Sequence, residues 1–393
     1  MNRRPVNSVL AIVSAFGRGS HYARLRLILV VSVAAIFSIG LVMVFNTSSA
    51  EILDRWLEKN THQALFRQIC YGVSGGVIGL IVYRIGFDHL LKFSLPLLML
   101  GIFLLILVFV PGVGHIRNGA RRWIGFGPLT FQPSEFVKIL ILMYYIDYIL
   151  RFKGKEIALK AFLKIVAFLG VPMFLVMIEP DNGTTAVIGA SLLPLFFLSG
   201  VKFKYWALPF LIFLSLGVIA AYQLPYVRGR LEVYLNPELD LKGKGHQPHQ
   251  AKIAAGAGKL FGRGPGGSLQ KLTYLPEAQN DYIAAIYAEE FGFVGVTLLI
   301  VFYMLFAYAG FSIAAASKTM EGCYLATAIT FLIALQAFLN LGVVSGLLPS
   351  KGVNLPFFSQ GGTSLMANLM GVAILLSVAK KSERQHAQEK NHP

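Results

Sequence analysis

Repeated apolar runs of about 20 residues, almost free of charge, constrain this 393-residue chain more than any other feature. Each run is long enough for one helix to cross a lipid bilayer. Only 14% of the residues are charged and 55% are hydrophobic, whereas a soluble domain is about 25% charged. A soluble core cannot bury this apolar excess, so soluble enzymes, fibrous proteins and disordered chains are excluded. The sequence predicts a polytopic membrane protein, built from helices because lipid cannot satisfy an exposed strand edge.

Ten spans can be drawn from the apolar runs, which predicts an all-α membrane domain over residues 27–379. A cytoplasmic segment, 1–26, is expected to precede this domain, and a disordered cytoplasmic tail, 380–393, to follow it. One large outer loop, 225–280, precedes the eighth span. The predicted spans cover residues 27–47, 68–84, 94–111, 132–150, 161–178, 184–200, 205–224, 291–312, 323–346 and 361–379.

The distribution of Lys and Arg predicts the orientation of the chain. With the N-terminus inside, the cytoplasmic pieces hold 19 basic residues and the short outer loops hold 7. Long loops weigh less in the positive-inside rule, so this difference places both termini in the cytoplasm. The net charge of +16 is then explained by cytoplasmic loops and anionic membrane lipid rather than by nucleic acid, and no nucleic-acid partner is expected.

Several patterns that could indicate a cofactor have a simpler explanation. Cys70 and Cys323 both lie in apolar stretches, so neither a disulfide nor a zinc site is expected. His246 and His249 have no evident third ligand. The segment Gly262–Gly267 matches GxGxxG, but Pro265 interrupts it and no strand precedes it in a βαβ unit. We therefore expect a close-packed or flexible backbone here, and no nucleotide or redox cofactor.

Charged side chains interrupt the fourth span at its outer end. Gln132, Glu135 and Lys138 are spaced three apart, so they share one face of a helix that Pro133 can begin. A lone charge at the bilayer centre costs roughly 2.5–3.5 kcal/mol on insertion scales, which pairing of Glu135 with Lys138 would offset. The pattern fits a structural ion pair or a polar cavity that faces a substrate.

Two further outer segments carry charge. Arg121 and Arg122 precede Trp123, which suits either a lipid phosphate, since guanidinium groups bind phosphate oxygens in pairs, or an ordinary interfacial anchor. Glu179 and Asp181 lie in a sequence typical of a tight turn, with a cation site as the alternative.

Asp281 is a candidate general base. It opens the eighth span, with Glu277 before it and Glu289 and Glu290 after it. Neighbouring carboxylates and partial burial favour the neutral form of an acid, which suits it to accept a proton near neutral pH. The alternative is an acid that merely stabilises a helix N-terminus.

At these residues the chain resembles the SEDS family (shape, elongation, division and sporulation), the FtsW/RodA proteins of bacteria. The resemblance runs from the third span to the tenth. It rests on five ordered motifs: Asn118–Ile124, Gln132–Lys138, Gly264–Lys271, Pro276–Gly292 and Gly346–Ser364. The chain departs from the family pattern at Gln279 and Asn280, where His and Thr are usual, and at Gln360, where Tyr is usual.

The resemblance implies a peptidoglycan glycosyltransferase that polymerises lipid II into a glycan strand at the cytoplasmic membrane, together with a class B penicillin-binding protein. Lys351, in the segment Pro349–Gly352, favours the division branch, which implies the septum and other division proteins as partners. A divalent cation, Mg²⁺ or Mn²⁺, is expected to assist. A lipid II flippase, a scaffold and an elongation polymerase are the alternatives.

The family's essential acid falls on Asp281, which is therefore the expected catalytic residue. The remaining site residues are expected to bind substrate, and no metal ligand is assigned. They are Arg121, Arg122, Glu135, Lys138, Gln270, Lys271, Glu277, Lys351 and Ser359.

Overall fold

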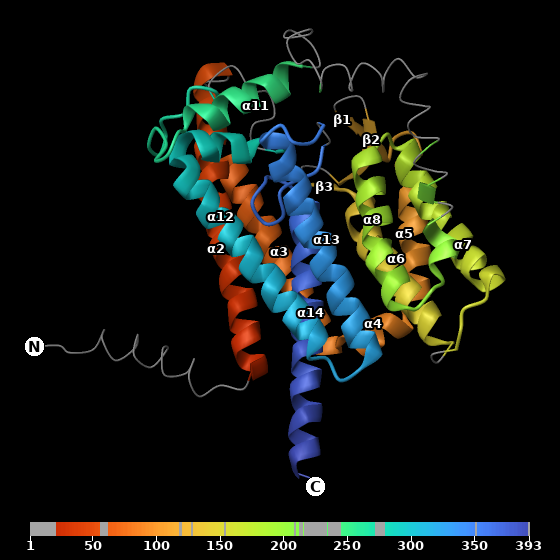
Figure 1. Ribbon diagram of the computed structural model, residues 1–393. Helices are drawn as coiled ribbons and strands as arrows, with labels where there is room; N and C mark the ends of the chain where they lie inside the picture. Colours follow the sequence, from red (N-terminus) through yellow and green to blue (C-terminus); the bar gives the residue numbers. More distant parts are fainter. Residues whose placement is uncertain are drawn as a thin grey trace, which may run out of the picture.

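The computed structural model is a helical bundle with a small sheet and a short helix at one end (Figure 1). The structure describes residues 21–55, 62–117, 120–126, 129–152, 155–207, 245–271, 280–349 and 352–391, together with residues 210, 211, 215 and 234.

The described helices match nine of the ten predicted spans, and most of the seventh prediction, 205–224, lies outside the described residues. The helices are α2 (His21–Arg55), α3 (Gln63–Ile85), α4 (Phe87–Lys92), α5 (Ser94–Val108), α6 (Pro133–Leu150), α7 (Leu159–Ile178), α8 (Asn182–Leu198), α11 (His246–Ala257), α12 (Ile283–Ala315), α13 (Met320–Val344) and α14 (Gly362–Asn391).

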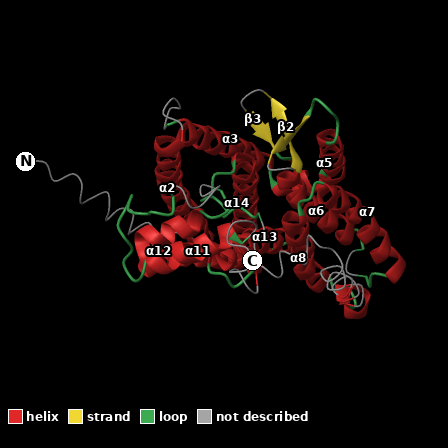
Figure 2. Cartoon of the chain, turned by 90° about the horizontal axis from the view of Figure 1, so that it is seen from above, coloured by secondary structure: helices red, strands yellow, loops and turns green. Residues whose placement is uncertain are grey.

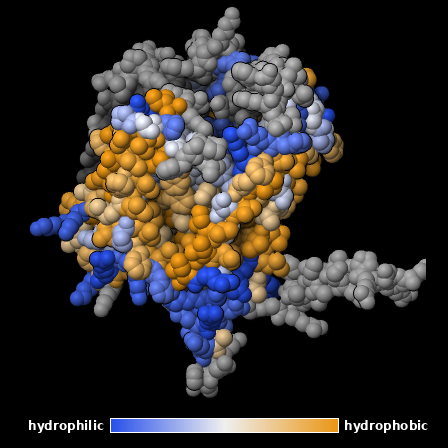
Figure 3. All heavy atoms as spheres, turned by 180° about the vertical axis from the view of Figure 1, so that it is seen from behind, coloured by the Kyte–Doolittle hydropathy of each residue, from blue (hydrophilic) through white to orange (hydrophobic). Residues whose placement is uncertain are grey.

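Six of these helices are long and apolar enough to cross a membrane: α2, α3, α7, α12, α13 and α14. Helices α5 and α8 are apolar but shorter, and α6 carries the charges noted above. Large apolar side chains such as Phe103, Phe197 and Met304 are exposed on the bundle. Figure 3 shows a broad hydrophobic band on one face of the molecule, with hydrophilic residues gathered at the end from which α14 emerges. This distribution is the one expected of a multi-pass membrane protein.

The sequence analysis predicted no strands, but three form a small antiparallel sheet. Strand β2 (Ala120–Phe126) lies between β1 (Gly114–Arg117) and β3 (Leu129–Phe131). The sheet lies at the end of the bundle where α6 begins, away from the far end of α14 (Figures 1 and 2). At this end water can satisfy the polar groups of the sheet edges, so the rule against strands in lipid is not broken.

The predicted disordered tail is helical in the structure, and that expectation was wrong. Helix α14 continues through Asn391 without a break. Ion pairs hold this extension to its neighbours: Glu383 to Arg26 at 2.6 Å, Lys381 to Asp88 at 2.7 Å, and Glu389 to Lys318 at 2.8 Å. Tertiary contacts therefore fix a polar segment whose composition alone suggested disorder.

The glycine-rich segment that matched GxGxxG packs against a kink in α12. Gly292 has φ +64°, and a Cβ atom there would lie 2.3 Å from the backbone nitrogen of Gly262. A Cβ atom at Gly262 would lie 2.1 Å from the carbonyl oxygen of Glu290. Of the two alternatives predicted, a close-packed or a flexible backbone, the structure shows the close-packed one, because two backbones approach each other where no side chain would fit.

Candidate active site at the sheet end of the bundle

The first turns of α6 place the predicted ion pair inside the protein. Lys138 Nζ donates to Glu135 Oε2 at 2.7 Å and to Gln336 Oε1 of α13 at 2.8 Å. Lys138 is 1% exposed and Glu135 8%. The spacing therefore predicted a real pair, and its link to α13 shows that the pair faces the bundle interior rather than lipid.

Asp281 lies immediately before α12 and is held against two other segments. The side-chain amide of Asn340, on α13, donates to the carbonyl oxygens of Asp281 and of Val353, both at 2.8 Å. A Cβ atom built on Gly352 would lie 3.1 Å from Asp281 Oδ2, so the carboxylate lies beside the backbone of this segment. Asp281 is partly exposed, as a base that meets a substrate must be.

Helix α13 connects these two groups. Gln336 contacts the ion pair and Asn340 contacts the Asp281 backbone. The two amides are four residues apart, so they share one face of the helix. One helix face thus carries contacts to both α6 and the start of α12, a connection that sequence analysis missed because neither amide belongs to a recognised motif.

Strand β2 and the α7–α8 turn contact each other at the rim of the bundle, at the end where the sheet lies. Arg122 Nε donates to the carbonyl oxygen of Glu179 at 2.9 Å, and Nη2 donates to that of Pro180 at 2.5 Å. The amide of Gln132 donates to Asp181 Oδ2 at 3.3 Å, and its backbone N–H donates to Thr363 Oγ1 at 3.1 Å. Three parts of the chain that are far apart in sequence therefore meet here: residues 122–132, the α7–α8 turn and the start of α14.

The turn prediction for this segment is confirmed. Asp181 is the N-cap of α8, where Oδ1 accepts from the backbone N–H of Thr184 at 3.1 Å and Oδ2 accepts from its hydroxyl at 2.9 Å. Among the residues that the structure describes, no group of three or more His, Cys, Asp or Glu side chains could hold a metal ion.

Lys271 connects the loop that precedes α12 to two helices, α2 and α12. Its Nζ donates to Asn46 Oδ1 at 2.7 Å, to the carbonyl oxygen of Gly266 at 2.8 Å and to Glu290 Oε1 at 2.9 Å. These three bonds use all its N–H groups, so the ammonium positions the loop in this conformation. Glu289, in turn, accepts from the hydroxyl of Ser268.

The two glutamates expected to act beside Asp281 are therefore engaged elsewhere, by the loop. Arg263 also pairs with Glu289, at 3.0 Å. A pair of buried carboxylates with basic and hydroxyl partners is a structural anchor for the loop against α12, and it leaves Asp281 as the separate acid at the mouth of the bundle.

The other predicted binding residues are placed less centrally. Ser359 is buried, and its hydroxyl accepts from the backbone N–H of Leu355 at 3.0 Å. The side chain of Gln270 ends in a buried oxygen with no hydrogen-bond partner among the described residues. Arg121 is half-buried on β2. Glu277 and Lys351 lie outside the described residues.

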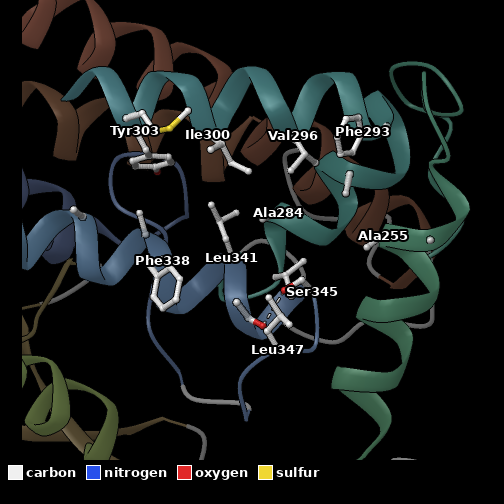
Figure 4. Close-up of a pocket in the computed structure, with 18 of the residues that line it drawn as sticks. Ala255, Ala284, Phe293, Val296, Ile300, Tyr303, Phe338, Leu341, Ser345 and Leu347 are labelled. Carbon is white, nitrogen blue, oxygen red and sulfur yellow. Dashed lines mark hydrogen bonds between the residues drawn. The ribbon is translucent and has the colours of Figure 1, made fainter. Parts of the chain in front are cut away.

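An apolar pocket of about 770 Å³ opens between α12 and α13 (Figure 4). Its lining includes Ala284, three residues after Asp281, and Ile300, Tyr303 and Phe338 further along the helices. The pocket therefore offers an apolar surface adjacent to the segment that carries the candidate base.

Comparison with known proteins identifies the family. Residues 26–384 match the model of the FtsW/RodA/SpoVE family, described as cell cycle proteins. The chain is 37% identical to the probable peptidoglycan glycosyltransferase FtsW of Legionella pneumophila, with 91% of each chain covered. It is 35% identical to the stage V sporulation protein E of Bacillus subtilis, with 91% of this chain and 97% of that protein covered.

Two solved structures have the same fold as this chain. One is a chain of a peptidoglycan synthase complex that coordinates polymerization and crosslinking. It aligns with a TM-score of 0.74 and 26% identity, covering 90% of this chain and 97% of that one. The rod shape determining protein RodA of Thermus thermophilus aligns with a TM-score of 0.65 and 27% identity, covering 90% and 96%. Because the family model spans most of the chain and close relatives cover it almost end to end, this protein belongs to the FtsW/RodA/SpoVE family of cell cycle proteins.

Proposed function

We propose that this protein is a peptidoglycan glycosyltransferase that polymerises lipid II on the outer face of the bacterial cytoplasmic membrane during cell division. The observation that carries this proposal is the position of Asp281. It is a partly exposed acid at the mouth of the bundle, held by α13, which also contacts the buried Glu135–Lys138 pair. The names of the curated relatives support the same activity.

In this mechanism Asp281 accepts the proton from the 4-hydroxyl of the acceptor sugar. The oxygen then forms a bond to the anomeric carbon of the lipid-linked strand, and the bond from that carbon to undecaprenyl pyrophosphate breaks. The leaving group keeps the bonding electron pair, so negative charge develops on the pyrophosphate. Arg121 and Arg122 on the outer rim, and Lys138 below it, are the described cations that would stabilise this charge.

The substrate is an amphiphile, and the site combines the two kinds of surface that such a molecule needs. The apolar pocket between α12 and α13 includes Ala284, three residues after Asp281, in its lining. The polar network of α6 and α13 lies on the bundle interior. A lipid-linked sugar could therefore contact apolar side chains with its tail while its head group reaches the acid.

The full topology belongs to the same proposal. Ten spans, with both termini in the cytoplasm, would place the sheet, α11 and Asp281 outside and the extension of α14 inside. The peptidoglycan synthase complex among the structural relatives supports a penicillin-binding protein as partner. A septal location, other division proteins and assistance by Mg²⁺ or Mn²⁺ remain parts of this proposal, and no step of the mechanism depends on the metal.

A lipid II transporter is the second candidate, favoured by the buried charge pair in the bundle interior. The two functions differ in their products. A glycosyltransferase lengthens glycan from substrate already on its own side of the membrane, whereas a transporter moves substrate between two compartments and makes no glycan.

Polymerisation by purified variants tests the proposal. Wild type and Asp281→Asn would each be incubated with lipid II, a penicillin-binding partner and Mg²⁺, and the glycan products separated on a gel. Since a positioned base contributes about 10²–10⁴-fold, we expect Asp281→Asn to lose polymerisation by at least the lower figure. Asp88→Asn, which removes an acid from the opposite end of the bundle, is the matched control and should polymerise normally.

Equal activity of wild type and Asp281→Asn, in folded protein, would remove Asp281 from the mechanism. If folded wild type makes no glycan with its partner present, transport between two compartments becomes the better assignment.

A further inference from the structure

The turn between α7 and α8 holds two buried carboxyl groups whose hydrogen bonding differs. Both oxygens of Asp181 accept hydrogen bonds, from Thr184 and from Gln132. Glu179 is 1% exposed, and neither of its carboxyl oxygens has a hydrogen-bond partner among the described residues. Burying an unpartnered carboxylate is costly, so this side chain needs an explanation that the proposed mechanism does not supply.

Arg122 is the cation beside this carboxyl group, but it binds the backbone of the turn instead. Its Nε and Nη2 donate to the carbonyl oxygens of Glu179 and Pro180, and its Nη1 lies 4.0 Å from Asp181 Oδ2. Among the described residues, the other charged groups that act on the turn are Asp181 itself and Glu135 of α6, which is paired with Lys138. The guanidinium thus stabilises the turn without neutralising Glu179.

The protonation state of Glu179 follows from this environment. Burial, together with the negative charge of Asp181, raises the pKa of its carboxyl to about 8 against the opposing effect of Arg122. The group is therefore mostly neutral at neutral pH, which avoids an unpaired buried charge. Once ionised, it becomes a stronger acceptor for a guanidinium than a backbone carbonyl, because charge-assisted hydrogen bonds are about twice as strong.

We propose that Glu179 is a positioning residue whose protonated form keeps Arg122 bound to the carbonyl oxygens of the α7–α8 turn, and whose ionised form draws the guanidinium to its own carboxylate. The movement of Arg122 would affect the site through Asp181. This carboxylate accepts a hydrogen bond from the side chain of Gln132, and the backbone N–H of Gln132 donates to Thr363 of α14. Its effect on turnover rests on the proposed glycosyl transfer. Glu179 itself touches no substrate, since its oxygens are buried.

The movement of Arg122 can be tested without any activity assay. The midpoint of thermal unfolding would be measured for wild type, Glu179→Gln, Arg122→Gln and the double variant, below and above the pKa of Glu179. Below it, Arg122→Gln should lower the midpoint equally with Glu or Gln at position 179. Above it, the same change should lower the midpoint more when Glu179 is present, because only then does an ionic contact exist to be lost.

Infrared difference spectra provide a direct titration. We expect the carbonyl band of one protonated carboxylic acid to disappear from wild type near pH 8 and to be absent from Glu179→Gln. An Arg122→Gln effect that is the same in both backgrounds at both pH values, or a band unaffected by Glu179→Gln, would overturn the proposal.

Polymerisation of lipid II tests the functional consequence. From one pH unit below the pKa to one unit above, the protonated fraction of a single acid falls roughly tenfold, and we expect the wild-type rate to follow it. Glu179→Gln, a neutral isostere, should keep its rate within about twofold, whereas parallel pH profiles of the two proteins would contradict a positioning role. Absence of glycan from wild type at every pH would refute the proposed function, while the thermal comparison would still decide the movement of Arg122.

Discussion

At the scale of single residues, Glu135 and Lys138 form a buried pair in which each charge needs the other to neutralise it. Replacing Lys138 with Met leaves Glu135 as an uncompensated charge in the bundle interior, which typically costs about 3–5 kcal/mol. We therefore expect Lys138→Met to lower the free energy of unfolding by about that amount. Thermal unfolding in detergent measures it. Glu135→Gln combined with Lys138→Met should recover most of the loss, and a double variant no more stable than Lys138→Met would show that charge imbalance is not the cause.

Residue spacing in the sequence predicted some side-chain contacts of this site and not others. Residues three apart on α6 predicted the pair correctly, because helical geometry alone brings them together. Nothing local predicted that Gln336 of α13 would complete the contact of Lys138. Nor did the motif around Lys271 indicate that its ammonium would donate to Asn46 of α2 and Glu290 of α12 as well as to the loop.

At the scale of elements, the kink of α12 at Gly292 lets the glycine-rich segment Gly262–Gly267 of the loop pack against this helix. We expect Gly292→Ala to destabilise the protein by at least about 1–2 kcal/mol, because left-handed backbone is unfavourable for Ala and its Cβ atom would overlap Gly262. Gly76→Ala in α3 is the control, since a Cβ atom there meets nothing within 4 Å. Protease cleavage of the loop should accelerate in Gly292→Ala only. Equal cleavage of both variants and wild type would contradict a seating role for the kink.

The extension of α14 gives a second prediction at this scale. Its ion pair to the α12–α13 connection is exposed and its pair to α2 is half-buried at the surface, so each contributes little, about 0–1 kcal/mol. Glu383→Gln, which breaks the pair with Arg26, should therefore leave the unfolding midpoint nearly unchanged. A large decrease would mean that the extension is an essential part of the bundle rather than an appended turn of helix.

At the scale of the whole molecule, the proposed orientation places the sheet outside and the end of α14 inside. In a variant without Cys70 and Cys323, single cysteines at exposed His115 and exposed Glu389 would be treated with a membrane-impermeant maleimide. We expect His115→Cys to react in intact spheroplasts and Glu389→Cys to react only after permeabilisation. The reverse pattern would invert the topology and would put Asp281 on the cytoplasmic side, where the proposed reaction could not occur.

The sequence by itself determined the membrane class, nine of the ten predicted helical segments and the Glu135–Lys138 pair. These follow from features that act within one segment: apolar length, the 3.6-residue period and charge at membrane depth. Only the tertiary structure decided which segments meet. It formed the sheet, ordered the extension of α14 and brought Gln132, Asp181 and Thr363 together. Such contacts join residues between about 50 and 230 positions apart, and no local periodicity encodes them. The packing of one helix against another selects them, because buried polar groups must find partners wherever the fold brings them.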